Sequence, residues 1–197
     1  MAPTIAPAQS VDLLLNCSAC HTIGAAANPG LASRYPVLNG QPAPYITRQL
    51  DAHRTGKRQN RQMILTAQAL GDGGAPAMAR MYAYAYLPEL VFTGDPEAMG
   101  TALDLHENGA RERGVPSCKS CHAVDDVGGI AMSSRNAPRL HGQTGPYIAQ
   151  KLRAYASGAR TTGPMGRMQA FAGQLSEAEI DALAAYYAAF QQEKPDE

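Results

Sequence analysis

The sequence predicts an all-α protein made of two tandem halves, and three observations support this prediction. Residues 35–58 match residues 137–160 without a gap, which indicates an internal duplication. Each half carries one C-x-x-C-H motif, and the two motifs together use all four cysteines of the 197-residue chain. Apolar residues recur at helical spacing in both halves, and no run of residues convincingly predicts a strand.

The duplicated segments read YPVLNGQPAPYITRQLDAHRTGKR and APRLHGQTGPYIAQKLRAYASGAR, at a constant offset of 102 residues. The residues that they share include Pro36 and Pro138, Gly40-Gln41 and Gly142-Gln143, Tyr45-Ile46 and Tyr147-Ile148, and Arg58 and Arg160. The turn-rich run Thr93-Gly94-Asp95-Pro96 separates the halves. We therefore predict an N-terminal domain over residues 1–93 and a C-terminal domain over residues 94–197.

Each half is expected to contain three helices. The first leads into the cysteine motif and covers Val11–Cys20 or Gly100–Cys121. The second spans Pro44–Thr55 or Pro146–Ser157, with a proline near its start, where the missing N–H costs nothing.

The last helix is clearest in the second half, where Ser176 and Glu179 form a capping box. Its apolar stripe then consists of Ile180, Leu183, Ala184 and Tyr187. In the first half the matching helix is expected over Ala77–Leu87, with Pro76 at its start. Alternating tyrosines in that segment favour a strand, but the repeat favours a helix more strongly.

The C-x-x-C-H motifs predict covalently bound haem. Two thiols three positions apart can each add to one vinyl group of a haem, and the adjacent imidazole can then ligate the iron. Cys17, Cys20 and His21 form the first such set, and Cys118, Cys121 and His122 form the second. Two motifs without a leftover cysteine predict two covalently attached haem c groups. The low aromatic content of 6% agrees, because a buried haem supplies the missing bulk.

Other uses of the four cysteines fit the sequence less well. A zinc ribbon places its two cysteine pairs about 15–20 residues apart, whereas here nearly the whole first repeat separates them. A thioredoxin-like motif needs a βαβ pattern, which is not visible. Two disulfides are possible in a secreted protein, but C-x-x-C bridges are mostly redox-active.

A methionine opposite each histidine would complete the coordination of the iron and raise its potential. Met63 is the candidate in the first half. Met165 and Met168 compete in the second half: Met165 matches Met63 when counted from Arg160, and Met168 matches it when counted back from the last helix. We favour Met168, because the helix anchors the loop more rigidly. The predicted iron ligands are therefore His21, Met63, His122 and Met168.

The remaining methionines and histidines are interpreted as packing or surface residues. These are Met78, Met81, Met99, Met132, His53, His106 and His141. Pro36 and Pro138 follow the haem motifs at the position where a proline carbonyl can accept the Nδ1–H of the ligand histidine.

The overall charge and hydropathy exclude several classes of partner. The formal net charge is zero, so nothing indicates nucleic acid or an anionic membrane as a partner. Residues 1–95 carry a charge of +2 and residues 96–197 carry −2, which is a weak dipole. No apolar run is long enough for a membrane helix. Since covalent haem attachment in bacteria takes place outside the cytoplasm, we expect export to the periplasm, with a signal peptide that this sequence lacks.

Taken together, these motifs resemble the cytochrome c4 family of bacterial dihaem proteins. The resemblance rests on two C-x-x-C-H units, each followed by P-x-L-x-G-Q, by P-Y-I, by a helix ending in G-x-R, and by a methionine and a last helix. It extends from Val11 to Phe190 and is most specific in LSEAEIDALAAYYAAF. The first half departs from the family where LGDGGAPAMARMYAYAYLPEL replaces the usual acidic cap.

The resemblance implies two class I cytochrome c domains related by a pseudo-twofold axis, with the haem propionates facing each other. Arg34, Tyr35, Arg135 and Asn136 are candidate propionate partners. It also implies a periplasmic electron carrier that links a donor dehydrogenase or quinol-oxidising complex to a terminal oxidase or another acceptor. The alternatives are a dedicated cytochrome subunit of a flavin- or molybdenum-dependent dehydrogenase and, less favoured, a haem enzyme such as a thiosulfate dehydrogenase.

Overall fold

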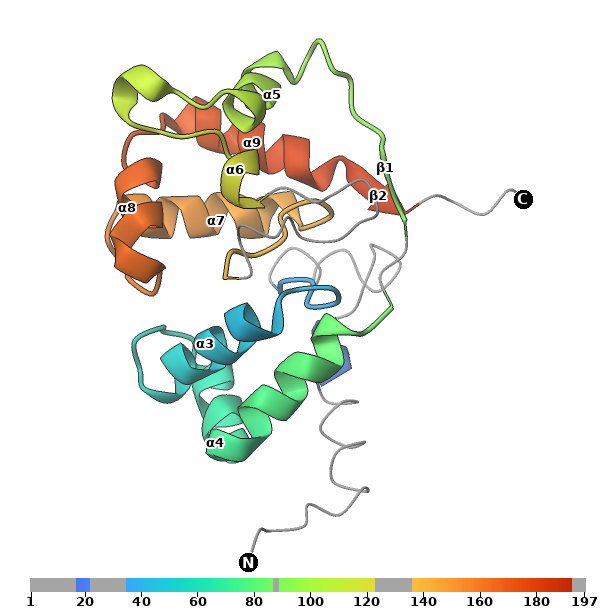
Figure 1. Cartoon of the computed structure of the whole chain (residues 1–197), viewed down its shortest axis with the longest axis vertical. Coiled ribbons are helices and arrows are strands. Elements are labelled where there is room, and N and C mark those ends of the chain that lie inside the picture. The colour runs from blue at the N-terminus through green and yellow to red at the C-terminus, as the bar shows by residue number, and fades with distance from the viewer. Residues whose placement is uncertain (1–16, 22–34, 87–88, 123–135, 193–197) are drawn as a thin grey trace, which may run out of the picture.

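The computed structural model describes residues 17–21, 35–86, 89–122 and 136–192. Its helices form two groups, one from each half of the chain, stacked along the long axis of the molecule (Figure 1). The first group consists of α3 (Ala43–Arg54) and α4 (Arg61–Ala83). The second consists of α5 (Gly100–Glu107), α6 (Lys119–His122), α7 (Gly145–Ala156), α8 (Arg167–Ala172) and α9 (Glu177–Ala188). The prediction of a mainly helical chain in two halves is confirmed.

Helices α3 and α7 are the repeated second helix, and both lie within one or two residues of their expected ranges. Each has a proline in its first turn. Helix α3 buries Ile46 and Leu50, and α7 buries Ile148 at the position equivalent to Ile46. The two helices therefore present the same apolar face to the core of their own half.

Helix α4 begins well before the expected range of Ala77–Leu87, and this expectation was wrong. The helix runs from Arg61 to Ala83 and bends at Gly71, where φ is 62° and ψ is −174°. Pro76 lies inside it rather than at its start. The equivalent part of the second half is divided into α8 and α9, and α9 begins with the predicted Ser176–Glu179 capping box.

The expected helix Gly100–Cys121 is interrupted, and this is a second correction. Helix α5 ends at Glu107, a 3-10 turn η1 covers Arg111–Arg113, and α6 begins at Lys119. Gly109 makes the reversal possible, because it has a φ of 73° and an added Cβ would lie 2.4 Å from the Val115 carbonyl oxygen. The equivalent helix Val11–Cys20 lies mostly outside the described residues.

The structure also contains a small sheet that the sequence did not predict. Strand β1 (Leu90–Phe92) pairs with β2 (Phe190–Gln192) in antiparallel register, with Val91 opposite Gln191. Strands of three residues carry too little alternation to be recognised. The sheet attaches the segment just before the predicted domain boundary to the end of the second half (Figure 1). The boundary itself, between residues 93 and 94, stays a prediction.

Each half has a core of its own. The core of the first half is built from α3 and α4, with the predicted packing residue Met78 buried in it and Cys17 against it. The core of the second half joins α5, α7 and α9, with Cys118 against it. Met81, also expected in the core, is 38% exposed. Among the described helices none is long and apolar enough to cross a membrane.

Candidate haem-binding site

A cavity of about 1060 Å³ lies between the two halves and is lined by residues from both. The first half contributes His21 and Met63, and the second contributes His122 and Met168, together with Cys118 and Cys121. Cys17 and Cys20 lie on the turn that leads to His21, where the His21 amide donates to the Cys17 carbonyl over 2.9 Å. The structure therefore brings the predicted ligand sets of both halves to one connected space.

Both motif histidines are held in one orientation by a proline carbonyl. The Nδ1–H of His21 donates to the Pro36 carbonyl over 2.8 Å, and that of His122 donates to the Pro138 carbonyl over 2.7 Å. This is the arrangement anticipated for the two prolines. Because Nδ1 carries the proton, Nε2 keeps its lone pair and can bind a metal. Burial lowers the pKa of both rings, which favours the neutral form that metal binding requires.

The four cysteines are all partly buried, and none is joined to another in a disulfide. They do not gather into a zinc site, because the described residues contain no cluster of three or more His, Cys, Asp or Glu side chains able to hold a metal ion. Burial is the main cause that raises the pKa of Cys17 and Cys118. Two separate pairs of thiols, each beside its own histidine, suit two separate covalent attachments.

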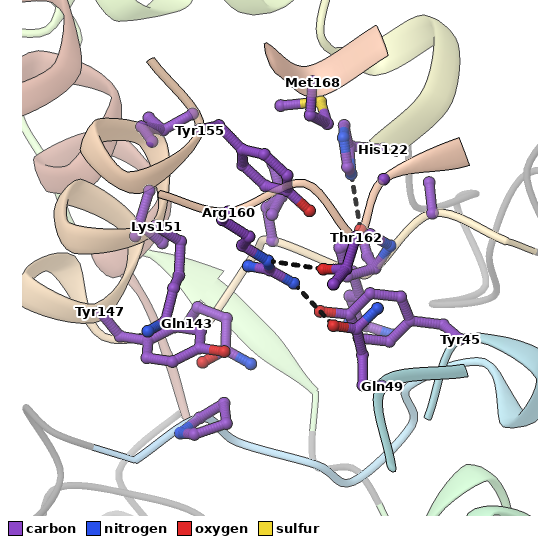
Figure 2. A pocket seen from close by; sticks show the side chains of 18 of the residues that line it. Tyr45, Gln49, His122, Gln143, Tyr147, Lys151, Tyr155, Arg160, Thr162 and Met168 are labelled. Carbon is purple, nitrogen blue, oxygen red and sulfur yellow. Dashed lines mark hydrogen bonds between the residues drawn. The ribbon is translucent and has the colours of Figure 1, made fainter. Parts of the chain in front are cut away.

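The candidate methionines lie at equivalent places, in the first turn of α4 and of α8. Met63 donates its backbone N–H to the side chain of Asn60, the N-cap of α4, and its side chain is half-buried. Met168 is also half-buried and lines the cavity (Figure 2). Met165 reaches the cavity rim but is 76% exposed. The surroundings favour Met168 over Met165, as the counting from the last helix did.

The described wall of the cavity is lined by more basic than acidic side chains. No aspartate or glutamate occurs among its described lining residues, whereas six cations do: Arg48, Arg58, Arg139, Lys151, Arg160 and Arg167. Burial, followed by repulsion from Arg58 and Arg160, lowers the pKa of Lys151 to about 8. Such a wall favours an anionic occupant.

Two of these arginines belong to a polar network that joins α3 to the second half. The Gln49 side-chain oxygen accepts from Arg58 and from Arg160, each over 2.9 Å. Arg58 also donates to the Tyr147 hydroxyl over 2.7 Å. Arg160 also donates to the Thr162 hydroxyl (Figure 2). Sequence reasoning did not assign these cations to the site, although the repetition of Arg58 as Arg160 was a usable signal.

Two of the four candidate propionate partners lie among the described residues. Tyr35 and Asn136 line the cavity, and Arg48 donates to the Asn136 carbonyl over 2.6 Å. Arg34 and Arg135 lie outside the described residues.

The halves also exchange equivalent hydrogen bonds. Gln41 binds the backbone of Arg139, and Gln143 binds the backbone of Val37, which is the equivalent position in the repeat. Reciprocal contacts of this kind indicate a pseudo-twofold relation between the halves.

These residues fit haem as the bound group. The cavity is lined by two histidines with an available Nε2 and by methionine side chains, and a pair of cysteines lies next to each histidine in the chain. The basic side chains on its described wall suit the two propionates that each haem carries.

Comparison with known proteins agrees with this chemistry. The family model "Cytochrome C oxidase, cbb3-type, subunit III" matches residues 108–186. Cytochrome c4 from Thiocapsa roseopersicina is 34% identical over 94% of this chain and 93% of its own length. A "Thiosulfate dehydrogenase electron acceptor" from Thiomonas intermedia is 34% identical over 88% of this chain and 78% of its own length.

Solved structures show the same likeness. Reduced recombinant cytochrome c4 from Pseudomonas stutzeri has a TM-score of 0.74 at 25% identity, with 96% of this chain and 100% of that chain covered. Thiosulfate dehydrogenase (TsdBA) from Marichromatium purpuratum has a TM-score of 0.68 at 30% identity, with 88% of this chain and 36% of that chain covered. The likeness extends over both halves, and the chain belongs to the cytochrome c4 family of dihaem c-type cytochromes, electron carriers with two covalently attached haem c groups.

Proposed function

We propose that this protein is a periplasmic shuttle that moves single electrons from a donor dehydrogenase or quinol-oxidising complex to a terminal oxidase or another acceptor. The observation that carries the proposal is the cavity, which gathers a histidine and a methionine from each half. A haem iron with histidine and methionine as axial ligands supplies reversible one-electron chemistry. If each iron is held by one of these histidines and one of these methionines, no position would remain for a substrate to bind to it.

The chain's own residues would divide the work as follows. Cys17 and Cys20 would attach the first haem, and His21 and Met63 would ligate its iron. Cys118 and Cys121 would attach the second haem, with His122 and Met168 as its ligands. Pro36 and Pro138 fix the orientation of the two imidazoles through their carbonyl oxygens. The cavity arginines and Lys151 would stabilise the propionates.

A dedicated partner of a dehydrogenase is the second candidate, and a specific observation favours it. Relatives from Thiomonas intermedia and Stutzerimonas stutzeri, 34% and 35% identical to this chain, are named thiosulfate dehydrogenase electron acceptors. In the Marichromatium purpuratum structure a similar fold occurs in a much longer thiosulfate dehydrogenase chain. A donor that oxidises an inorganic sulfur compound is therefore the most specific partner that we propose.

The ligand assignment is tested by spectroscopy of the haem-loaded protein. We expect a pyridine haemochrome count of two haems per chain. The oxidised protein should also show the weak far-red charge-transfer band of iron–methionine bonding. One haem per chain, or absence of that band, would overturn the assignment.

The two candidate roles are separated by stopped-flow reduction. Rapid reduction by a thiosulfate dehydrogenase, with slow reduction by a quinol-oxidising complex, would establish the dedicated partner. Rapid reduction by both donors is expected for a shuttle. The isolated protein mixed with thiosulfate is the control, and it should not become reduced by itself.

A further inference from the structure

The peptide group that holds each motif histidine is itself held by a glutamine from the other half. Pro36 contributes its carbonyl to His21, and the N–H of the same peptide group belongs to Val37. That N–H donates to the side-chain oxygen of Gln143 over 3.0 Å. The Gln143 amide nitrogen donates to the Val37 carbonyl over 2.6 Å, which closes the contact. Gln143 thus reaches His21 through a single peptide group.

The second histidine is held by the equivalent set of hydrogen bonds, with the roles of the two halves exchanged. The Pro138 carbonyl accepts from His122, and the N–H of that peptide group belongs to Arg139. It donates to the side-chain oxygen of Gln41 over 2.9 Å, and the Gln41 amide nitrogen donates to the Arg139 carbonyl over 2.9 Å. Gln41 and Gln143 are only 4% and 5% exposed, so water competes little for these bonds.

Hydrogen bonds in such a chain strengthen one another. When a peptide N–H donates to an acceptor, electron density shifts onto the carbonyl oxygen of the same peptide group, which then becomes a better acceptor. A better acceptor at Nδ1–H makes the imidazole more basic, and a more basic axial ligand stabilises the oxidised iron. An interface glutamine can therefore affect an iron that its own half does not ligate.

We propose that Gln143 lowers the potential of the first haem and that Gln41 lowers the potential of the second, each acting across the interface through the peptide that holds the axial histidine. Both glutamines are positioning residues, since they act on the iron through other groups. The inference rests on the proposed function in one respect, the assignment of His21 and His122 as iron ligands. The packing of the two halves against each other would thus affect the reduction potentials of both haems.

The test uses the full haem-loaded protein with Gln143→Met, which keeps the length of the side chain and removes both hydrogen bonds. Redox titration followed by the hyperfine-shifted haem methyl resonances in NMR reports the two potentials separately. We expect the potential of the first haem to rise more than that of the second. In the reduced protein the His21 Nδ1–H resonance should move upfield, because its hydrogen bond weakens.

Gln41→Met is the matched control, since it removes the equivalent side chain. It should raise the potential of the second haem and move the His122 Nδ1–H resonance, with His21 less affected. The proposal therefore predicts that each substitution changes mainly the haem of the other half. A general loosening of the interface would affect both haems in both variants, and a local effect would fall on the haem of the substituted half. Either result would overturn the inference.

A third variant separates polarisation from packing and also serves if the methionine variants fold poorly. Gln143→Glu keeps an oxygen that can accept from the Val37 N–H but loses the donor to the Val37 carbonyl. The His21 Nδ1–H resonance should stay at or downfield of its wild-type position, and an upfield shift would overturn the inference. Failure of the proposed function has a different signature, because the wild-type protein itself would then lack the iron–methionine band.

Discussion

Met165 and Met168 are only three residues apart, yet their surroundings differ sharply. Met168 lies half-buried on α8 against the cavity, while Met165 is 76% exposed and has a left-handed φ of 56°. Non-glycine residues in this conformation are uncommon and are held there by the surrounding turn. At the residue scale, the surroundings therefore favour Met168 over Met165 as the proposed ligand of the second haem.

We predict that Met168→Ala opens the coordination of the second iron. Its potential should fall, because the thioether favours the ferrous state. About half of the far-red iron–methionine band should disappear, as one of two such bonds is lost. Visible spectra and redox titration measure both effects.

Met165→Ala is the matched control and should leave the spectrum nearly unchanged. If Met165→Ala removed the band and Met168→Ala did not, the count from Arg160 would have been the better guide to the ligand.

Burying His141 in the core of the second half lowers the stability of the fold. Its Nδ1 is buried and has no hydrogen-bond partner among the residues that the structure describes, while its ring packs against Phe190 at 4.4 Å and Tyr187 at 5.2 Å. Burial lowers its pKa to about 4, helped by repulsion from His106 and then Arg139. An unfolded chain therefore takes up this proton first as the pH falls, because an ordinary histidine has a pKa of about 6.5.

We predict that His141→Phe stabilises the protein and makes it less sensitive to acid. The wild-type contribution from neutral His141 is fully present above pH 6.5 and is lost as the pH falls toward 4. Phenylalanine removes the unpaired nitrogen, so the free energy of unfolding should fall less over that range. Urea denaturation at pH 7 and at pH 4.5 measures it. An equal fall in both proteins would contradict the prediction.

At the scale of single elements, Gly71 determines the course of α4. Its φ of 62° and ψ of −174° belong to a region that only glycine adopts readily, and the helix bends there. The second half solves the same problem with a loop between α8 and α9. The chain therefore changes direction at a single glycine in the first half, and between α8 and the capped start of α9 in the second half.

We predict that Gly71→Ala destabilises the protein by about 1–3 kcal/mol through backbone strain. Steric clash is not the cause, since an added Cβ would meet nothing within 4 Å. Gly73→Ala is the control: its Cβ would also lie in open space, its φ is not positive, and it should stabilise the helix by about 0.5–1 kcal/mol. Urea denaturation followed by circular dichroism measures both, and equal effects would contradict the role of Gly71.

The sequence predicted elements where a local signal marks their ends. Prolines mark the starts of α3 and α7, and the Ser176–Glu179 pair marks the start of α9. The prediction of the start of α4 was wrong, because Gly71, Gly73, Gly74 and Pro76 resemble a helix boundary. In the actual helix Gly71 forms the bend, and Gly73, Gly74 and Pro76 follow it. Nothing local marked β1, whose pairing depends on residues about a hundred positions away.

The same distinction applies to the site. The motif residues could be identified because haem attachment fixes their spacing along the chain. The cavity cations could not be assigned, because Arg58, Lys151 and Arg160 meet only when the two halves pack together. From the sequence alone, each of these basic residues is interpreted as a surface residue. Only the fold shows that they lie together on one cavity wall.

At the scale of the whole molecule, strand β1 joins the tail of the first half to the second. The Phe92 ring lies 5.1 Å from Phe190 and 5.9 Å from Tyr186, and the Thr93 N–H donates to the Ala189 carbonyl. Residues just before the predicted boundary between 93 and 94 therefore pack against the second half.

We predict that a haem-loaded fragment 89–197 is more stable than the fragment 94–197, since only the longer one can form the sheet. The midpoint of urea denaturation should be higher for residues 89–197. Fragment 89–197 carrying Phe92→Ala is the control and should lie between the two. Equal midpoints for all three fragments would show that β1 adds nothing to the second half.

The glutamine contacts have a consequence for how such a molecule could arise. Gln41 binds position 139 and Gln143 binds position 37, so each half offers the other the same patch that it receives. Two separate copies of one ancestral domain would meet in the same way, as in an isologous dimer, but only at sufficient protein concentration. Gene duplication replaced that dependence by a tether, which keeps the second copy at an effective concentration of the order of millimolar. Once joined, the copies were free to diverge, as Asn39 and His141 have done at equivalent positions.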